Sequence, residues 1–387
     1  MSGIAKICLS TQEYPPRIGG VGVAAQRLAV NLVSAGYQVH VVTPCDTPDA
    51  AGTLQRSVED DVVVYRFFHD FQQAQGLFAY RKLLRSLDEE IDFDLFHGFF
   101  LTMAYPCVKA ASRRDRQRPV IASVRGVDVV TLIDHPYLRN TMISALRKVT
   151  WLTSVNQLYL DRVAEDVDIS GRSSVIRNSI SLPSEMTETW RLGNRNRGVV
   201  GTVGRFRWVK DIPLLMRGYN NVHPSLRRRL LLAGYFDSTD RNEEVWSQIL
   251  AEEFGLTEQV ELTGRFTHNE VFNYLRAMHV YVQPSAYEGM PNALLEAASL
   301  GVPLVATAVG GMREILTDGR NALLVPHGDP DQLGAAISRI LRDPELANHL
   351  SQGARRLAEY FNPERERKQW LTLYERLLTA NSPEKIL

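Results

Sequence analysis

The segment Gln283-Pro-Ser-Ala-Tyr-Glu-Gly-Met-Pro-Asn-Ala-Leu-Leu-Glu-Ala297 predicts a junction between a strand and a helix. The short apolar run Val280–Val282 comes directly before it and is typical of a buried strand. Pro291 is suited to the first position of a helix, because its missing N–H would have no partner there. The segment therefore predicts one turn of an α/β sheet with a loop at the carboxyl end of its strand.

Two carboxylates flank this loop. Glu288 lies within it, and Glu296 lies about a turn and a half into the helix. The backbone N–H groups between Gly289 and Asn292 stand at the helix N-terminus, which is a favourable place for an anion. Alone, two such residues are more often a helix cap and a solvated side chain. The Gly-x-Pro-Asn insert favours a ligand whose hydroxyl groups donate to the carboxylates.

A second segment, Gly201-Thr-Val-Gly-Arg-Phe-Arg-Trp-Val-Lys-Asp211, follows another predicted strand. Arg205 and Lys210 lie at the carboxyl edge of that strand, and Gly201 and Gly204 let the backbone approach a ligand. A guanidinium offers a bidentate fork and an ammonium a point charge, a combination suited to a diphosphate. Two surface cations on such a turn are common, so the segment alone is a weak signal.

The same rhythm of short β-branched runs and helical patterns extends along the whole chain. The strands predicted before the middle of the chain are Ile4–Ser10, Val39–Thr43, Val62–Phe67, Leu95–Phe99, Val120–Val124, Leu152–Val155 and Val175–Arg177. Those predicted after it are Val199–Val203, Arg229–Ala233, Val260–Leu262, Val280–Val282, Leu304–Thr307 and Ala322–Val325. Strands separated by helices imply βαβ units and parallel sheets.

The alternation lapses at Ser179–Arg197, a polar stretch that reads as a linker. We therefore expect an N-terminal Rossmann-like domain over 1–180, a linker over 181–197, and a second such domain over 198–362. The segment 363–387 contains a last helix, Pro363–Ala380, which we expect to return to the first domain. The predicted fold class is α/β, with two doubly wound domains facing across a cleft.

Charge and cysteine content exclude several classes of protein. The 387 residues carry 44 basic and 44 acidic side chains, so the formal net charge is zero and a nucleic-acid platform is not expected. The three cysteines, Cys8, Cys45 and Cys107, are scattered, which favours a reducing cytoplasm over a disulfide framework. The N-terminus has no apolar signal region, and no stretch approaches the roughly 18 apolar residues of a membrane span.

Taken together, four pieces of sequence resemble the retaining GT-B glycosyltransferases of family 4, also called glycosyl transferases group 1. The pieces are Gly204-Arg205 with Lys210, Glu288 to Glu296, Val309-Gly-Gly-Met-Arg-Glu314, and Asp318-Gly-Arg-Asn-Ala-Leu-Leu-Val325. The resemblance is strong from Gly201 to Leu341 and looser before it. It implies a GT-B fold and transfer of a sugar, as in hexosyltransferases, from a nucleoside diphosphate such as UDP or GDP to a glycan, lipid-linked or small-molecule hydroxyl.

The resemblance also implies roles for individual residues of the second domain. Arg205 and Lys210 would hold the donor diphosphate and stabilise the leaving group, while Glu288 would contact the donor sugar. Glu296 would bind the ribose hydroxyls. The remaining donor-binding positions are Gly204, Gly289, Met290, Pro291 and Asn292.

In the first domain the resemblance implies a glycine loop at Gly19 and Gly20, near the diphosphate and the acceptor. Arg125 stands where many relatives carry a histidine, so it would bind phosphate or an acidic acceptor, or form a structural pair with Asp128. In the first case Asp128 would bind an acceptor hydroxyl. His97, at the end of a strand, is a further candidate for the site, although a lone histidine there is often a packed residue.

Retention of configuration allows two mechanisms. One is a double displacement, for which Glu288 is the only formal nucleophile. The other is front-face attack, in which a donor phosphate oxygen takes the acceptor proton, and we adopt this reading because the family is usually described so. We expect no metal and no other cofactor. The patterns Asp92-Phe-Asp94 and Asp166-Val-Asp168 match a DxD metal motif but are poorly placed for one.

Other classes of protein fit less well. Gly20-Val-Gly-Val-Ala-Ala25 matches a dinucleotide fingerprint, but its glycines are too far from the strand, and His40 stands where an acid is needed. A nucleotide-sugar epimerase or a non-catalytic nucleotide-sugar-binding protein shares the fold and stays open. A phosphorylase would need a cofactor-bearing lysine and a longer chain.

The expected partners are a nucleotide sugar and an acceptor, with no nucleic acid, in a monomer or weak dimer. Basic residues leave peripheral contact with the inner face of the membrane open for this otherwise cytoplasmic protein. They form the amphipathic stretch Phe78–Arg85 and the cluster Arg113, Arg114, Arg116 and Arg118. Ordinary solvated surface is the favoured reading of both.

Overall fold

The chain folds into two compact units in a computed structural model that describes residues 4–16, 19–45, 54–68, 74–112, 117–126, 128–129, 133–136, 138–180, 182, 198–237 and 241–380. The N-terminal unit comprises residues 1–178 with 364–387, and the C-terminal unit comprises residues 179–363. Most of the predicted linker, including 183–197, lies outside the described residues.

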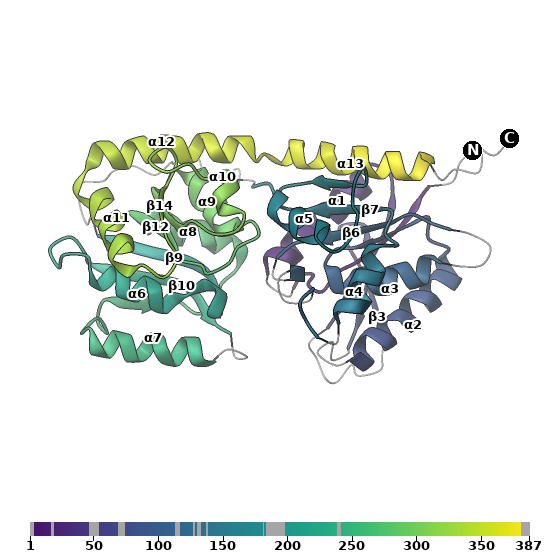
Figure 1. The fold of residues 1–387 in the computed structure, drawn as a ribbon, viewed down its shortest axis with the longest axis horizontal. Coiled ribbons are helices and arrows are strands. Elements are labelled where there is room, and N and C mark those ends of the chain that lie inside the picture. The colour runs from purple at the N-terminus through teal and green to yellow at the C-terminus, as the bar shows by residue number, and fades with distance from the viewer. Residues whose placement is uncertain are drawn as a thin grey trace. The chain divides into compact units, whose positions relative to one another are not determined.

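The N-terminal unit is built on an eight-stranded sheet with the order β3-β4-β2-β1-β5-β6-β7-β8. The strands are β1 (Lys6–Ser10), β2 (Gln38–Pro44), β3 (Leu54–Glu59), β4 (Val62–Phe67), β5 (Leu95–Gly98), β6 (Val120–Val124), β7 (Trp151–Ser154) and β8 (Ser173–Val175). The helices are α1 (Gly20–Ser34), α2 (Ala74–Ile91), α3 (Leu101–Ala111), α4 (Arg139–Leu146), α5 (Gln157–Ala164) and α13 (Pro363–Ala380). In Figure 1, α1 and α13 lie on one side of this sheet and α2 and α3 on the other.

The last helix, α13, is part of the core of the N-terminal unit. Trp370 and Tyr374 are fully buried in one cluster with residues of α1 and β1. The guanidinium of Arg27 donates to both carboxylate oxygens of Glu366, at 2.8 and 3.3 Å, which joins α1 to α13. The aromatic pair four residues apart thus buries one face of the helix, as its spacing predicts.

The C-terminal unit is built on a six-stranded sheet in which every strand pair is parallel, with the order β11-β10-β9-β12-β13-β14. The strands are β9 (Val199–Phe206), β10 (Arg229–Phe236), β11 (Val260–Leu262), β12 (Val280–Gln283), β13 (Leu304–Thr307) and β14 (Leu323–Val325). The helices are η3 (Trp208–Lys210), α6 (Ile212–Asn220), α7 (Arg241–Glu253), α8 (His268–Ala277), α9 (Asn292–Leu300), α10 (Met312–Ile315), α11 (Pro330–Arg342) and α12 (Pro344–Tyr360). Figure 1 shows α6 and α7 on one side of the sheet and α9 and α12 on the other.

Strand order reverses once near the first strand of each unit. In the N-terminal unit, β1 lies between β2 and β5. In the C-terminal unit, β9 lies between β10 and β12 in the same way. At such a switch point the loops that leave the carboxyl ends of the two central strands diverge, and ligands bind there in open α/β sheets. The loops after β9 and β12 are those picked out by the sequence.

The two doubly wound α/β sheets confirm the predicted fold class, but one strand was missed. β3 pairs with β4 in the antiparallel sense at the edge of the sheet, so the N-terminal sheet is not wholly parallel. Its residues, Leu54-Gln-Arg-Ser-Val-Glu59, are mostly exposed. An edge strand that buries neither face has no need of a continuous apolar run, which is why the pattern did not reveal it.

The core of the N-terminal unit contains a histidine that is held neutral. His40 in β2 is buried between the rings of Tyr65 and Phe93, with centroids 6.0 and 5.3 Å away. Neither of its ring nitrogens has a hydrogen-bond partner among the described residues. Burial, followed by the nearby cations Lys6 and Arg56, lowers the pKa of His40 to about 4.

We predict that this unit loses stability in mild acid. His40 is neutral in the folded state, whereas in the unfolded chain it binds a proton near its usual pKa of about 6.5. The stabilisation is present above that pH and is lost as the pH falls towards 4, by at most about 3 kcal/mol. Thermal unfolding between pH 7 and pH 5 should therefore show a falling midpoint, with a shallower slope in His40→Phe. An unchanged slope in the variant would assign the acid sensitivity to other groups.

Candidate functional site

The loop after β9 carries Lys210 at the end of η3. Asp211, with φ 44° and ψ 57°, turns the chain and accepts a hydrogen bond from the backbone N–H of Leu214 at 3.0 Å, which caps α6. The backbone N–H of Ala286 donates to the carbonyl of Val209 at 2.9 Å. The loops after β9 and β12 are therefore joined through their backbones directly beside Lys210.

Lys210 and Glu288 form an ion pair between these two loops. The Lys210 Nζ lies 2.5 Å from the Glu288 Oε1, and the two side chains are 21% and 11% exposed. The same oxygen accepts from Gln283 Nε2 at 2.9 Å and from Ser285 Oγ at 2.8 Å. The structure thus brings together two of the residues predicted from the sequence, in a partly buried setting.

Glu296 is buried in α9 rather than solvated. Burial raises the pKa of the neighbouring Tyr281 phenol above its usual value, and the carboxylates of Glu288 and Glu296 raise it further. Both acids therefore lie close to Tyr281. The helix begins at Asn292, so Pro291 is the residue before it and not its first position, and no side chain caps that end.

Arg205, at the end of β9, pairs with a buried acid that the sequence did not reveal. Its Nη2 lies 2.6 Å from the Oδ2 of Asp237, just beyond the end of β10. Gly204 lies beside Gly234 in the parallel ladder, where a Cβ on Gly234 would stand 1.8 Å from the carbonyl oxygen of Gly204. The close approach of these two strands fixes where the guanidinium leaves the sheet.

The loop after β13 packs against the backbone of Glu288. Gly310, with φ 48°, packs so closely that a Cβ there would lie 2.1 Å from the backbone oxygen of Glu288. The N–H of Gly311 donates to that oxygen at 2.9 Å. The two glycines of the Val309-Gly-Gly segment thus fix the position of the Glu288 backbone. The loop after β13 therefore contributes to the site together with the loops after β9 and β12.

In the N-terminal unit, the predicted glycine loop is occupied by an acid. A Cβ on Gly19, the residue before α1, would lie 2.0 Å from the Oε2 of Glu13, so the Glu13 carboxylate lies at the start of the loop's helix. Gln12 Nε2 donates to Thr102 Oγ1 at 2.5 Å, which connects the loop after β1 to the start of α3, the helix that follows β5. Gly19 and Gly20 thus lie between β1 and α1 beside Glu13, and their place near the diphosphate and the acceptor stays a prediction.

His97 is a core residue in this structure. It is fully buried, its Nδ1 lies 2.7 Å from the Tyr374 hydroxyl, and its Nε2 lies 2.7 Å from Ser123 Oγ. Burial, followed by the charge of Arg125, holds the pKa of His97 well below its usual value. Since both ring nitrogens are taken by neighbouring side chains, the prediction that His97 serves a ligand is not supported.

Arg125 and Asp128 do not form the side-chain pair that one reading of the sequence predicts. Asp128 accepts from the backbone N–H groups of Leu101 at 3.1 Å, Gly126 at 2.7 Å and Arg125 at 3.2 Å. Both of its oxygens are thereby engaged, and burial raises its pKa to about 6. Asp128 thus caps backbone N–H groups in this structure, and its role towards an acceptor hydroxyl stays a prediction.

The Arg125 guanidinium instead donates to Asn178 Oδ1 and stacks on Phe99, with its Cζ 4.3 Å from the ring centroid. Burial lowers the pKa of Arg125 to about 10. The residue remains a candidate for the site, but it is tied to the last residue of the first segment of its unit rather than to Asp128.

The two DxD patterns serve the fold. The Asp94 carboxylate accepts from the backbone N–H of Lys6 at 2.9 Å, and Asp168 accepts from that of Ser170 at 3.0 Å. Asp166 is paired with arginines. Across the described ranges, no group of three or more histidine, cysteine or acidic side chains lies close enough together to hold a metal ion.

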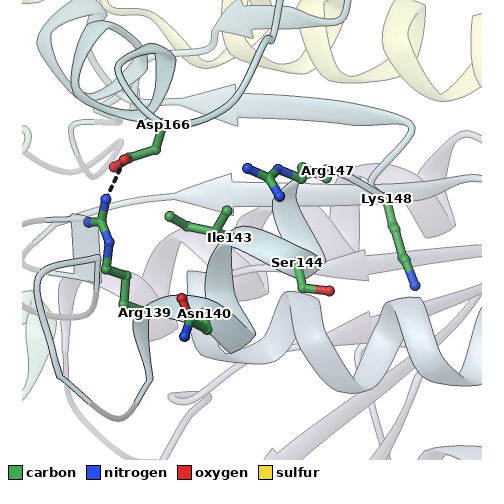
Figure 2. A pocket seen from close by; sticks show the side chains of 7 residues that line it. All are labelled: Arg139, Asn140, Ile143, Ser144, Arg147, Lys148 and Asp166. Atoms are coloured by element: carbon green, nitrogen blue, oxygen red, sulfur yellow. Dashed lines mark hydrogen bonds and ion pairs between the residues drawn. The ribbon is translucent and has the colours of Figure 1, made fainter.

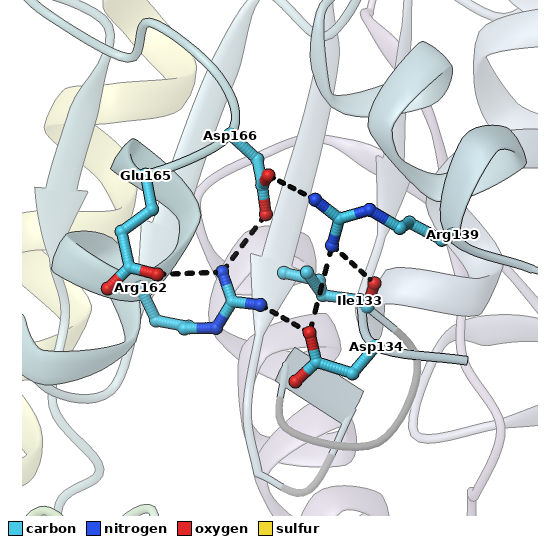
Figure 3. Close-up of polar contacts among 6 residues, drawn as sticks. All are labelled: Ile133, Asp134, Arg139, Arg162, Glu165 and Asp166. Atoms are coloured by element: carbon cyan, nitrogen blue, oxygen red, sulfur yellow. Dashed lines mark hydrogen bonds and ion pairs between the residues drawn. The ribbon is translucent and has the colours of Figure 1, made fainter. Parts of the chain in front are cut away.

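A polar pocket of about 660 Å³ opens along α4 (Figure 2). It is lined by Arg139, Asn140, Ile143, Ser144, Arg147, Lys148 and Asp166. One end is held by alternating ion pairs among Arg139, Asp166, Arg162 and Asp134 (Figure 3). None of the residues predicted for the site lines this pocket, although Asp166 of one DxD pattern does, and the charge of Arg139 on its wall is paired with Asp134 and Asp166.

The predicted basic surface is smaller than its sequence suggests. Arg118 is buried in a bidentate pair with Asp88, and Arg113, Arg114 and Arg116 lie outside the described residues. On α2, the half-exposed ring of Phe78 lies under the cations of Arg81 and Lys82. None of the described helices is long and apolar enough to cross a membrane. Membrane contact stays a prediction that rests on α2.

The geometry of the two units defines a class of protein: two Rossmann-like domains with a long C-terminal helix, which is the GT-B fold. The chain matches the glycosyl transferases group 1 over residues 188–357 and glycosyltransferase family 4 over residues 18–182. It belongs to this family and is a nucleotide-sugar-dependent glycosyltransferase.

Individual relatives agree with that family. The chain is 22% identical to N-acetyl-alpha-D-glucosaminyl L-malate synthase of Bacillus anthracis, over 96% of this chain and 97% of that protein. Its structure is similar to sucrose-phosphate synthase from Thermosynechococcus elongatus, with a TM-score of 0.80, 20% identity, and coverage of 97% and 100%. It is also similar to Anabaena HepE in complex with UDP-glucose, with a TM-score of 0.77, 17% identity, and coverage of 96% and 100%.

Four residues around the two switch points were missed from the sequence: Glu13, Asp237, Gln283 and Ser285. Each follows or ends a buried strand at its carboxyl edge. Polar residues at that position are a usable signal, because parallel strands deliver their carboxyl ends to one edge. The signal does not say whether the partner is a ligand or another loop.

We predict that Gly310→Ala disturbs Glu288. A side chain at Gly310 would suffer both the left-handed backbone conformation and the clash with the Glu288 oxygen. Gly319→Ala is the matched control, because Gly319 has φ 69° and a Cβ added there would meet no atom within 4 Å. The control should cost about 1 kcal/mol of unfolding free energy from strain alone, and Gly310→Ala should cost more. Urea unfolding measures this, and equal losses would show that the contact does not constrain the loop.

Proposed function

We propose that this protein is a retaining glycosyltransferase that moves a sugar from a nucleoside diphosphate to an acceptor hydroxyl. The donor is bound by the C-terminal unit and the acceptor by the N-terminal unit. The observation that carries the proposal is the Lys210–Glu288 pair at the β9/β12 switch point, beside the start of α9, which no side chain caps. A cation, an acid and a helix N-terminus are together suited to a sugar diphosphate.

The donor fits these residues by charge. Arg205 and Lys210 bind the diphosphate, and the backbone of Gly204 and the turn from Gly289 to Asn292, with Met290 and Pro291, lie along it. Glu296, buried in α9, accepts from the ribose hydroxyls. HepE binds UDP-glucose, so a UDP-hexose is the first donor to test.

The chemistry requires stabilisation of a departing nucleoside diphosphate. Preorganised cations and helix amides meet that developing charge without reorganising. The Glu288 carboxylate accepts at Oε1 from three donors, one of them the Lys210 cation, and this sharing of its charge weakens it as a covalent nucleophile. This supports front-face attack, in which a phosphate oxygen of the donor takes the acceptor proton while Glu288 orients the sugar.

For the acceptor we propose candidate residues and a broad class of molecule. Gly19 and Gly20 at the β1/β5 switch point and the buried cation Arg125 are the candidates in the N-terminal unit. The acceptor is a glycan, a lipid-linked sugar or a small molecule that offers a hydroxyl group. An anionic acceptor would be drawn to Arg125, whose charge in this structure meets an amide oxygen.

Binding of a nucleotide sugar is the first test. At 100 times its dissociation constant, a donor should add roughly 2.7 kcal/mol to the unfolding free energy. Thermal shift with UDP-, GDP-, ADP- and TDP-sugars should find at least one such donor, and NMR of the product should show the donor's anomeric configuration. An isomerised free sugar would identify an epimerase instead. No shift with any donor and no hydrolysis would contradict the proposal.

Turnover should not depend on a divalent metal. Arg205 and Lys210 supply the positive charge that a metal ion supplies in other sugar transferases. We therefore expect the initial rate of sugar release or transfer to be unchanged by excess EDTA. A rate that vanishes with EDTA and returns with magnesium or manganese would show that these two side chains are insufficient.

A further inference from the structure

The side chain of Gln283 connects the end of β12 to Glu288. It is buried, and the Tyr281 hydroxyl donates to its Oε1 at 2.5 Å. With its oxygen fixed by Tyr281, the amide turns its Nε2 to Ser285 Oγ at 2.7 Å and to Glu288 Oε1 at 2.9 Å. An amide with both ends engaged in this way has one orientation.

Ser285 completes the contact. It is fully buried and donates its hydroxyl to Glu288 Oε1 at 2.8 Å. Its backbone oxygen accepts from Thr307 Oγ1 at 2.6 Å, which fixes the peptide to the end of β13. Gln283 and Ser285 are thus held from behind, by Tyr281 and Thr307, before they reach Glu288.

Three donors contact one carboxylate oxygen of Glu288, and none of them contacts the other. Oε1 of Glu288 receives Lys210, Gln283 and Ser285, whereas Oε2 accepts no hydrogen bond from any residue within the described ranges. Donors that approach one oxygen from three side chains prevent rotation of the carboxylate. The direction of Oε2 is therefore set before any ligand arrives.

We infer that Gln283 and Ser285 are positioning residues that aim Oε2 of Glu288 at a hydroxyl of the donor sugar. The inference rests on the proposed function, which assigns Glu288 to the sugar. Both residues are uncharged, so they orient the carboxylate without cancelling its charge. Lys210 has a separate task at the diphosphate in the proposed function, so the two neutral donors are the contacts dedicated to Glu288.

The sugar and the nucleotide should respond differently when these donors are removed. Positioning of Glu288 affects contacts with the sugar alone, whereas general damage to the unit affects the nucleotide as well. UDP and UDP-glucose therefore form a diagnostic pair of ligands, or else the nucleotide and nucleotide sugar that the wild-type screen identifies. Loss of positioning at a distance from the reacting atoms typically costs roughly 10- to 100-fold in rate or affinity.

The experiment compares Ser285→Ala and Gln283→Leu with the control Ser247→Ala. Ser247 is another buried serine of the C-terminal unit, on α7, and its hydroxyl donates to the Glu243 carbonyl at 2.7 Å, away from Glu288. We expect UDP affinity within about twofold of wild type in all three. We expect kcat/KM for the nucleotide sugar to fall roughly 10- to 100-fold in the first two and not in the control. Calorimetry and initial rates measure these quantities.

An isosteric variant separates positioning from packing. Gln283→Glu keeps the shape and the acceptor for Tyr281 but removes the N–H group that faces Glu288. It should lose at least as much kcat/KM as Gln283→Leu. Wild-type turnover in Gln283→Glu and Ser285→Ala, or a parallel loss of UDP affinity, would overturn the inference while the proposed function stands. Wild-type protein that neither binds nor turns over any nucleotide sugar would overturn both.

Discussion

The Lys210–Glu288 pair is the constraint on which the C-terminal unit depends. A partly buried amine and carboxylate each lose hydration, and the loss is offset only when they face one another with further hydrogen bonds. The two residues are 78 apart in the chain and 2.5 Å apart in space. Their contact requires the loops after β9 and β12 to meet, which in turn requires these strands to be neighbours in the sheet. The reversal of strand order at β9 makes β9 and β12 adjacent.

Three adjacent strand ends converge on Glu288. The loop after β9 supplies Lys210, β12 supplies Gln283, and the loop after β13 supplies Gly310, which packs against the Glu288 backbone. In the sheet these strands stand in the order β9-β12-β13. A change in the register of any one strand would move one side of the pair, so the packing of the apolar strands controls the geometry of a polar site several residues beyond them.

The features that could be predicted from the sequence are those that depend on a local pattern of apolar residues. Apolar runs located the parallel strands, and the spacing of Trp370 and Tyr374 anticipated the packing of α13. The exposed edge strand β3 lacks such a run and was missed. The roles of Gln283 and Ser285 could not be predicted, because their partner lies in a neighbouring loop and only the fold determines the distance. Lys210 and Glu288 were found because their segments match a family, while their mutual contact was not.

Three of the residues predicted for the site show how a group prepared for a ligand differs from a structural one at a sheet edge. His97, Asp128 and Glu288 all lie near the carboxyl ends of strands, and each is buried or nearly so. Neighbouring groups take both nitrogens of His97 and both oxygens of Asp128. Within the described part of the chain, the side-chain donors to Glu288 all meet one oxygen. A polar side chain at such an edge is prepared for a ligand when the protein fixes one of its atoms and leaves another without a partner. That asymmetry depends on the fold, so residue type and spacing alone cannot reveal it.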